Sequence, residues 1–300
     1  MRSAIMAIAT AFLLVAPAAR AQDSPPSSDL VLEAIWREGI EQSRVAELAQ
    51  VLLDSLGPRL TGSPGSEAAA NWVIDTYRSW GIEARSEPYG TWMGWRRGTS
   101  HLDMVEPRVR TLEATMLAWS PGTQGPVRGS AVALPRLADT QALANFLAEV
   151  HGQFVLLTAP EPSCRPENNW EQWATPESLA RHQLDLDSTR ADWIDRARST
   201  GVTSLGELAE MLEGAGAAGI LSSEWSRGWG VDKVFAAATQ AIPQVDVSCE
   251  DYGLLWRLAV REQGPVVRLE AEAEALGEVP VANTIGMIRG SELPDEYVLL

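Results

Sequence analysis

The sequence has few of the residues on which catalysis most often depends. Its 300 residues include two cysteines, three histidines and a single lysine, Lys233. That lysine lies outside any G-x-x-x-x-G-K-[ST] loop, so no P-loop for nucleotide phosphates is present. No G-x-S-x-G pentapeptide occurs either, which argues against a serine hydrolase with a nucleophile elbow. The chain itself therefore offers few routes to catalysis.

Positive charge is also scarce. The formal net charge is -16, from 24 Lys and Arg residues against 40 Asp and Glu residues. Such a surface repels phosphate backbones and anionic lipid, so we expect neither nucleic acid nor a membrane surface as a partner. The hydrophobic share of 45% is ordinary for a protein that buries a core.

The first 21 residues have the layout of a secretory signal peptide. Arg2 precedes an apolar stretch from Ala4 to Val15, and Ala19-Arg20-Ala21 forms a small-x-small cleavage site. The apolar stretch is too short to span a bilayer. The pattern predicts a signal peptide over residues 1–21 and export to a periplasmic or extracellular location.

The two cysteines, Cys164 and Cys249, leave two readings open. In an oxidising compartment they can pair, but the sequence does not show that they lie close enough. Two buried free thiols are equally compatible with the sequence. Neither cysteine has a ligand partner at metal spacing, so we expect no cysteine-based metal site.

The first part of the chain alternates helical and strand-like patterns. Apolar residues recur at helical intervals over residues 30–56, and Gly57-Pro58 ends that helix. Ser63 or Ser66 can cap a second helix, which runs to about Trp80 and is stopped by Gly81. Three strand-like runs follow, and together with the helices they indicate an α/β layer architecture. These runs are residues 82–89, 101–105 and 109–117.

The composition of the sequence changes at about Ser120, where a Gly- and Pro-rich stretch suggests a hinge between domains. Short strands "AVALP", "FVLLTAP" and "IPQVDVS" follow, with predicted helices at residues 140–150, 176–213 and "CEDYGLLWRLAV". Residues 266–276 alternate apolar and acidic side chains, the pattern of a half-exposed strand.

One short motif and one residue type suggest binding chemistry. His101 and Asp103 in "SHLDM" lie on one face of a strand, and an H-x-D pair can bind zinc if further ligands join it. Neither His151 nor His182 lies in a recognisable second half, so strand alternation explains the pair. The 12 tryptophans include close pairs at 92/95, 170/173 and 225/229. Exposed indoles can stack on sugars, but core packing is the simpler expectation, and no carboxylate dyad supports a glycosidase.

Several stretches together resemble one family. "SLGPRLTGSPGSEAAANWVIDTYRSWGIEARSEPY" resembles the N-terminal region of di-zinc exopeptidases (clan MH metallopeptidases). "GWRRGTSHLDMVEPR" and "VANTIGMIRGSELPDEYVLL" resemble the carboxypeptidase Q group, also called plasma glutamate carboxypeptidase, within that family. The resemblance covers nearly the whole chain after the signal peptide, although residues 163–212 match poorly.

The resemblance implies an α/β fold in two parts. We expect the first part of a zinc-exopeptidase α/β domain, a mixed sheet flanked by helices, interrupted by a protease-associated α+β domain. The expected boundaries are residues 30–118 for the first part of the peptidase domain, 119–265 for the insertion and 266–300 for the return.

The resemblance also implies a function for the intact enzyme. In the family, the strand written here as "EYVLL" leads into an H-x-D motif that begins the site of two zinc ions, which activate a water for peptide hydrolysis. All of these ligands would lie beyond residue 300. We therefore expect no catalytic, cofactor-binding or metal residue, and no zinc, within residues 1–300, which would be inactive alone.

The expected substrates of the intact enzyme are small peptides, cleaved at one end, with the choice between carboxypeptidase and aminopeptidase action left open. A homodimer is possible, with Trp92 and Trp95 as interface anchors. The alternative reading is a secreted, non-catalytic module that binds a peptide or glycan.

Overall fold

The computed structural model describes residues 29–299, so the predicted signal peptide lies outside the described residues. The chain divides after Gly57 into two compact units, which are described separately. Within the described range, no helix is both long enough and apolar enough to cross a bilayer.

The described part of the first unit, residues 29–57, contains two short helices. Asp29 caps α1 (Leu30–Trp36), accepting a hydrogen bond from the N–H of Val31 at 2.8 Å, and a π-helical turn (Arg37–Glu41) follows. Next come α2 (Val45–Gln50) and a second π-helical turn (Val51–Ser55), and Gly57 ends the unit with φ +70°. The predicted single helix over residues 30–56 is thus wrong at residues 42–44, because Gln42 leaves the helical conformation (φ -112°, ψ 25°).

The second unit begins with α3 (Pro64–Ser79), whose ends match the sequence prediction. The Ser63 hydroxyl accepts a hydrogen bond from the N–H of Ser66 at 3.2 Å, and Gly81 has φ +79° where the helix stops. Ala69 is buried, whereas Trp80 is 46% exposed because it lies past the last turn. The helix packs against two long strands, β1 and β10.

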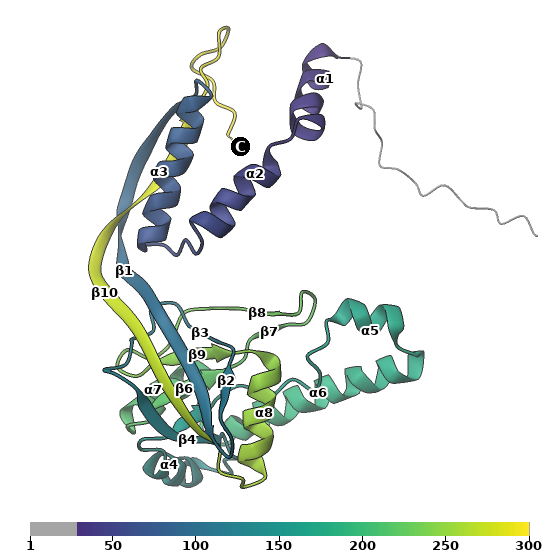
Figure 1. Ribbon diagram of the computed structural model, residues 1–300, viewed down its shortest axis with the longest axis vertical. Coiled ribbons are helices and arrows are strands. Elements are labelled where there is room, and N and C mark those ends of the chain that lie inside the picture. The colour runs from purple at the N-terminus through teal and green to yellow at the C-terminus, as the bar shows by residue number, and fades with distance from the viewer. Residues whose placement is uncertain (1–28, 300) are drawn as a thin grey trace, which may run out of the picture. The chain divides into compact units, whose positions relative to one another are not determined.

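A two-stranded ribbon is the main structural feature of this unit. β1 (Glu83–Glu106) and β10 (Val266–Met287) pair antiparallel from one end to the other, as the long blue and yellow-green strands of Figure 1 show. The predicted strands at 82–89 and 101–105 are therefore one strand. The glycines between them do not break it, because they allow close contact with the partner. A Cβ on Gly94 would lie 2.8 Å from Val279 Cγ1.

The ribbon continues into a mixed eight-stranded sheet with the order β2-β1-β10-β4-β5-β6-β9-β3. The remaining strands are β2 (Arg110–Leu112), β3 (Ala114–Met116), β4 (Val127–Ala133), β5 (Phe154–Leu156), β6 (Gly219–Ser222) and β9 (Gln244–Val247). The steps from β4 through β5 and β6 to β9 are parallel, and the other steps are antiparallel.

The two edge strands, β2 and β3, are separated only by Glu113, so the sheet curls back toward itself. The start of α8 (Cys249–Val260) fixes that turn. The Glu113 N–H donates to Asp251 Oδ2 at 2.9 Å, and the N–H of Ser248 donates to the Glu113 carbonyl at 2.9 Å.

Two hydrophobic cores lie on opposite faces of the sheet. In and after β5, Phe154 and Leu156 enter the core inside the curl, whereas Val155 and Leu157 enter the other. The inner core includes Tyr252 of α8 and side chains of the ribbon. The outer core is covered by α4 (Thr140–Glu149), α6 (Pro176–Arg198) and α7 (Leu205–Gly214). A mixed sheet flanked by helices confirms the predicted α/β class.

Other predicted segments differ in detail. The single helical stretch over residues 176–213 is two helices, α6 and α7, because Gly201 adopts φ +80° between them. The short helix α5 (Glu167–Trp173) and the hairpin of β7 (Trp225–Ser226) and β8 (Val231–Asp232) carry no clear sequence pattern.

The predicted final strand also differs. Residues 296–299 have no regular structure, and the exposed fraction of Leu299 is 95%. A strand requires a hydrogen-bonded neighbour, and no described segment pairs with these residues.

Candidate functional site

The H-x-D pair lies on β1, in the part of the ribbon that enters the sheet. His101 Nε2 is 3.1 Å from Asp103 Oδ1, and the Thr111 hydroxyl donates to the same oxygen at 3.0 Å. Arg268 on β10 lies 3.7 Å from the other carboxylate oxygen. Neighbouring side chains thus occupy both oxygens of Asp103, which fits an ion-pair network on the sheet surface.

The described residues do not fit a zinc site of the di-zinc kind. Between residues 29 and 299, no group of three or more His, Cys, Asp and Glu side chains has the arrangement needed to hold a metal ion. Two-metal hydrolysis requires several such ligands around two ions. No catalytic step through zinc can therefore be assigned to this part of the chain.

The strongest electrostatic feature is a buried acidic cluster at the carboxyl ends of parallel strands. Asp246 on β9 is 1% exposed, and its Oδ1 accepts hydrogen bonds from the Ser222 hydroxyl (3.1 Å) and the Glu224 N–H (3.0 Å). Its Oδ2 is buried without a hydrogen-bond partner among the described residues. Burial first, and then the charge of Asp232, raises the pKa of Asp246 to about 8.

The pKa values of two neighbouring side chains, Asp232 and Tyr252, are also raised. Burial, together with the charges of Glu113 and Glu250, raises the pKa of Asp232 to about 6. Tyr252 on α8 is buried, its hydroxyl donates to the Thr158 carbonyl at 2.6 Å, and burial raises its pKa. With a pKa of about 8, Asp246 is mostly protonated and uncharged at neutral pH.

Perturbed carboxyls often mark functional sites, but substrate cannot reach Asp246 at 1% exposure. A cavity of about 230 Å³ lies nearby, and Glu224 lines it. Its other polar walls include Thr158, which follows β5, and Ser223, which follows β6. The cluster thus supports the wall of a cavity that a small ligand can enter. Sequence reasoning missed this site, because "IPQVDVS" gives no sign that its aspartate is buried next to other acids.

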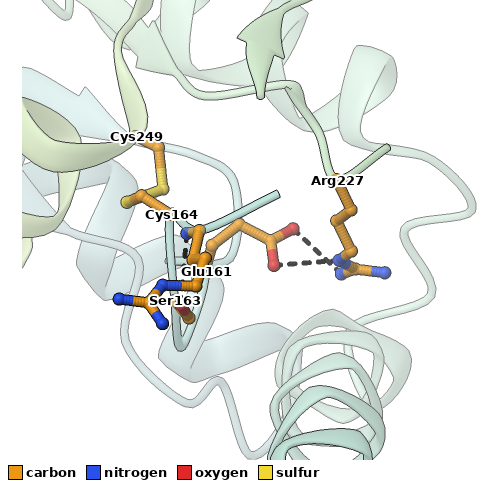
Figure 2. Close-up of a disulfide and its surroundings, with 6 residues drawn as sticks. Glu161, Ser163, Cys164, Arg227 and Cys249 are labelled. Carbon is orange, nitrogen blue, oxygen red and sulfur yellow. Dashed lines mark hydrogen bonds and ion pairs between the residues drawn. A yellow bond between two sulfur atoms is a disulfide. The ribbon is translucent and has the colours of Figure 1, made fainter. Parts of the chain in front are cut away.

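One rim of the cavity is fixed by an ion pair and a disulfide. Arg227 donates to Glu161 in a bidentate arrangement, with Nε to Oε2 at 3.1 Å and Nη2 to Oε1 at 2.9 Å. Figure 2 shows this pair beside the Cys164–Cys249 disulfide. The bond resolves the two readings left open by the sequence, because it ties the loop after β5 to the first turn of α8.

The tryptophan pairs divide between core and surface. Trp95 is 4% exposed, and its indole N–H donates to the Ser120 carbonyl at 3.0 Å, so it cannot anchor an interface as expected. Trp92 is 50% exposed and remains available for that role. Trp173 at the end of α5 and Trp229 in the turn between β7 and β8 are also exposed, but they belong to different segments.

Comparison with known proteins gives a consistent picture. No protein-family model matches the chain. Mouse carboxypeptidase Q is 23% identical over 262 residues, which cover 87% of this chain and 49% of the mouse protein. The human enzyme gives the same identity over 263 residues. The chain is similar to carboxypeptidase Q over most of its length. It spans about half the length of these curated relatives.

A solved structure supports the fold. The peptidase M28 precursor of Shewanella amazonensis SB2B matches with a TM-score of 0.53 and 23% identity. The match covers 86% of this chain and 53% of that protein. The described residues therefore have the fold of the matched part of an M28 peptidase, a fold that carries no function by itself.

Proposed function

We propose that this chain is the N-terminal portion of an exported zinc exopeptidase that releases terminal residues from small peptides. The observation that carries the proposal is the similarity to carboxypeptidase Q over 87% of the chain. The metal ligands and the catalytic base would lie beyond residue 300. The zinc ions, when bound by the complete enzyme, would polarise the scissile carbonyl and activate a water.

The domain organisation forms part of the proposal. Residues 30–118 and 266–300 would belong to the peptidase domain, and residues 119–265 would form the protease-associated insertion. The ribbon of β1 and β10 supports a single insertion, since the chain enters the inserted segment along β1 and returns from it along β10, the antiparallel partner of β1. Met104 and Leu269 pack in the same core as Phe154, so the ends of the ribbon would be built into the inserted lobe.

Export is supported by the disulfide as well as by the predicted signal peptide. Disulfides persist in oxidising compartments such as the periplasm and the extracellular space. N-terminal sequencing of the protein from its source should find Gln22 as the first residue. A mature protein that begins at Met1 would overturn this part of the proposal.

The test of the catalytic proposal compares two proteins. Sequencing the source gene past the codon for Leu300 supplies the longer reading frame, and both the 300-residue chain and the extended protein are then purified. We expect about two zinc ions per extended chain and hydrolysis of unblocked dipeptides by that protein only. Stoichiometric zinc with peptidase activity in residues 1–300 alone would contradict the placement of the site. A stop codon directly after Leu300 would remove the catalytic claim.

A non-catalytic binding module is the second candidate, and the cavity beside Glu224 is the observation that favours it. The two candidates separate clearly in one assay. An extended protein that binds small ligands, but that neither binds zinc nor hydrolyses peptide bonds at any pH, would favour the binding module.

A further inference from the structure

The cavity beside Glu224 lies where α/β proteins commonly bind small ligands. It opens past the carboxyl ends of the parallel strands β5 and β6, and α6 forms its opposite wall. Its volume of about 230 Å³ is below the roughly 300–1,000 Å³ of pockets that hold drug-sized molecules. The occupant should therefore be smaller than such molecules.

Three polar groups in the cavity wall lack partners among the described residues. The Ser223 hydroxyl is buried without a hydrogen bond, in a residue that is 8% exposed. The Glu224 carboxylate, which is partly buried, makes no direct hydrogen bond or ion pair within residues 29–299. Burial raises its pKa, and the charge of Lys233 opposes that shift. The Arg190 guanidinium on α6 makes no hydrogen bond or ion pair within the described residues and faces solvent. A buried polar group without a partner is costly, so a ligand that supplies one to Ser223 and Glu224 is favoured, whereas Arg190 at the solvent side is free to bind an anion.

The neighbouring acid is already neutralised. Glu161 also lines the cavity, but Arg227 binds both of its oxygens. Lys233, which lies outside the lining, partly balances the charge of Glu224. Within the lining, Glu224 and Arg190 are the charged side chains with no direct ion pair among the described residues. A ligand with one positive and one negative group would pair with both of these side chains.

The rest of the lining is apolar. Leu186, Trp193 and Ile194 of α6 and Leu205 at the start of α7 supply this surface. A ligand that fills the cavity should therefore carry a hydrophobic group beside its two charges.

We propose that this cavity binds a zwitterionic α-amino acid with an apolar side chain. Its ammonium group would pair with Glu224, its carboxylate with Arg190, and its side chain would lie on the apolar surface of α6. Ser223 would add a hydrogen bond to one of the two charged groups. Since the wall belongs to residues 158–227, the inference stands whether or not the complete protein is a peptidase.

The first test uses ligand analogues on the unaltered 300-residue chain. Isothermal titration calorimetry with L-leucine should show saturable binding at millimolar concentrations or below. Isoamylamine lacks the carboxylate, 4-methylpentanoate lacks the ammonium group, and glycine lacks the side chain. Each should bind at least tenfold more weakly, because each loses one of the three contacts. Equal binding of any of the three analogues, or no saturable binding of leucine, would overturn the proposal.

The second test uses variants with a matched control. Glu224→Gln and Arg190→Gln should each raise the Kd for leucine at least tenfold, the loss expected for one charge-assisted contact. Arg181→Gln removes an exposed guanidinium from the same helix but outside the cavity lining, and it should leave the Kd unchanged. Near-UV circular dichroism checks that each variant is folded. A folded pair of variants that binds leucine like the unaltered chain would refute the assignment.

Discussion

Replacing Asp246 with asparagine should stabilise the protein at neutral pH. The carboxyl is buried with one oxygen unpartnered, and its pKa is raised from an ordinary value of 3.8 to about 8. Below about pH 4 both the folded and the unfolded chain hold the proton. As the pH rises further, the unfolded chain ionises while the folded chain keeps its proton, so the free energy of unfolding falls until about pH 8 and then levels off.

The size of this effect follows from the pKa difference. Each pH unit between the two values costs about 1.4 kcal/mol, so at pH 7 the carboxyl lowers the free energy of unfolding by up to about 4 kcal/mol. Asparagine keeps the shape, accepts the same two hydrogen bonds through its oxygen and does not ionise in either state. Relaxation around the new amide will remove part of the gain. We expect Asp246→Asn to be more stable by at least about 1 kcal/mol at pH 7.

The assay is denaturant unfolding at several pH values between 5 and 9. The free energy of unfolding should fall more steeply with pH in the unaltered protein than in Asp246→Asn. Asp232 also titrates in this range, with a pKa of about 6, so the two acids should be read as a coupled pair. If the variant is less stable at pH 7 and both proteins show the same pH slope, the reasoning is wrong.

A second buried aspartate provides a control of opposite sign. Asp251 is 4% exposed, but Arg110 and the Glu113 N–H donate to both of its oxygens. Asp251→Asn turns one of these acceptors into a donor and leaves a partner unpaired. We expect this variant to lower the free energy of unfolding. If both variants were instead more stable, the gain at Asp246 would reflect only the removal of negative charge from this acidic chain.

Three further predictions concern the framework. Replacing Cys164 and Cys249 together with alanine should lower the free energy of unfolding by about 4 kcal/mol, because the bond closes a loop with a separation of 85 residues; reduced, unaltered protein should match the variant in denaturant titration. Gly94→Ala should destabilise the ribbon by about 2 kcal/mol more than Gly90→Ala, since a Cβ meets Val279 at the first position and nothing within 4 Å at the second; equal melting temperatures would contradict this. Arg110→Ala should cost about 3 kcal/mol, because it leaves a buried carboxylate uncompensated, and an unchanged unfolding midpoint would argue otherwise.

Local signals predicted the local structure well. The Ser63 cap, the stop at Gly81 and the alternation over residues 266–276 all act within a few residues, and the structure contains each of them. The α/β class follows from how such elements alternate along the chain. These features depend on the conformational preferences of neighbouring residues, which a short stretch of sequence is enough to indicate.

Features set by distant neighbours were not predictable. Gly94 looks like a strand break until its partner Val279 is placed against it. Cys164 and Cys249 lie far apart in the sequence, and only the fold of the loop after β5 onto α8 brings them together. The acidic cluster is the extreme case. The raised pKa values of its aspartates depend on burial, and these side chains become buried only when the sheet is assembled.

The ribbon explains how a large excursion of the chain can be accommodated in this fold. Glu83 pairs with Met287 at one end and Glu106 with Val266 at the other, so the chain leaves and returns along directly paired strands. Because side chains alternate between faces, a slip of one residue in this pairing would turn Leu102 and Leu269 out of the inner core. The glycine contacts in the middle of the ribbon and the core contacts at its end therefore select the same register. Because Phe154 and Tyr252 of the segment between Glu106 and Val266 pack in the same core as the end of the ribbon, that segment takes part in fixing the register.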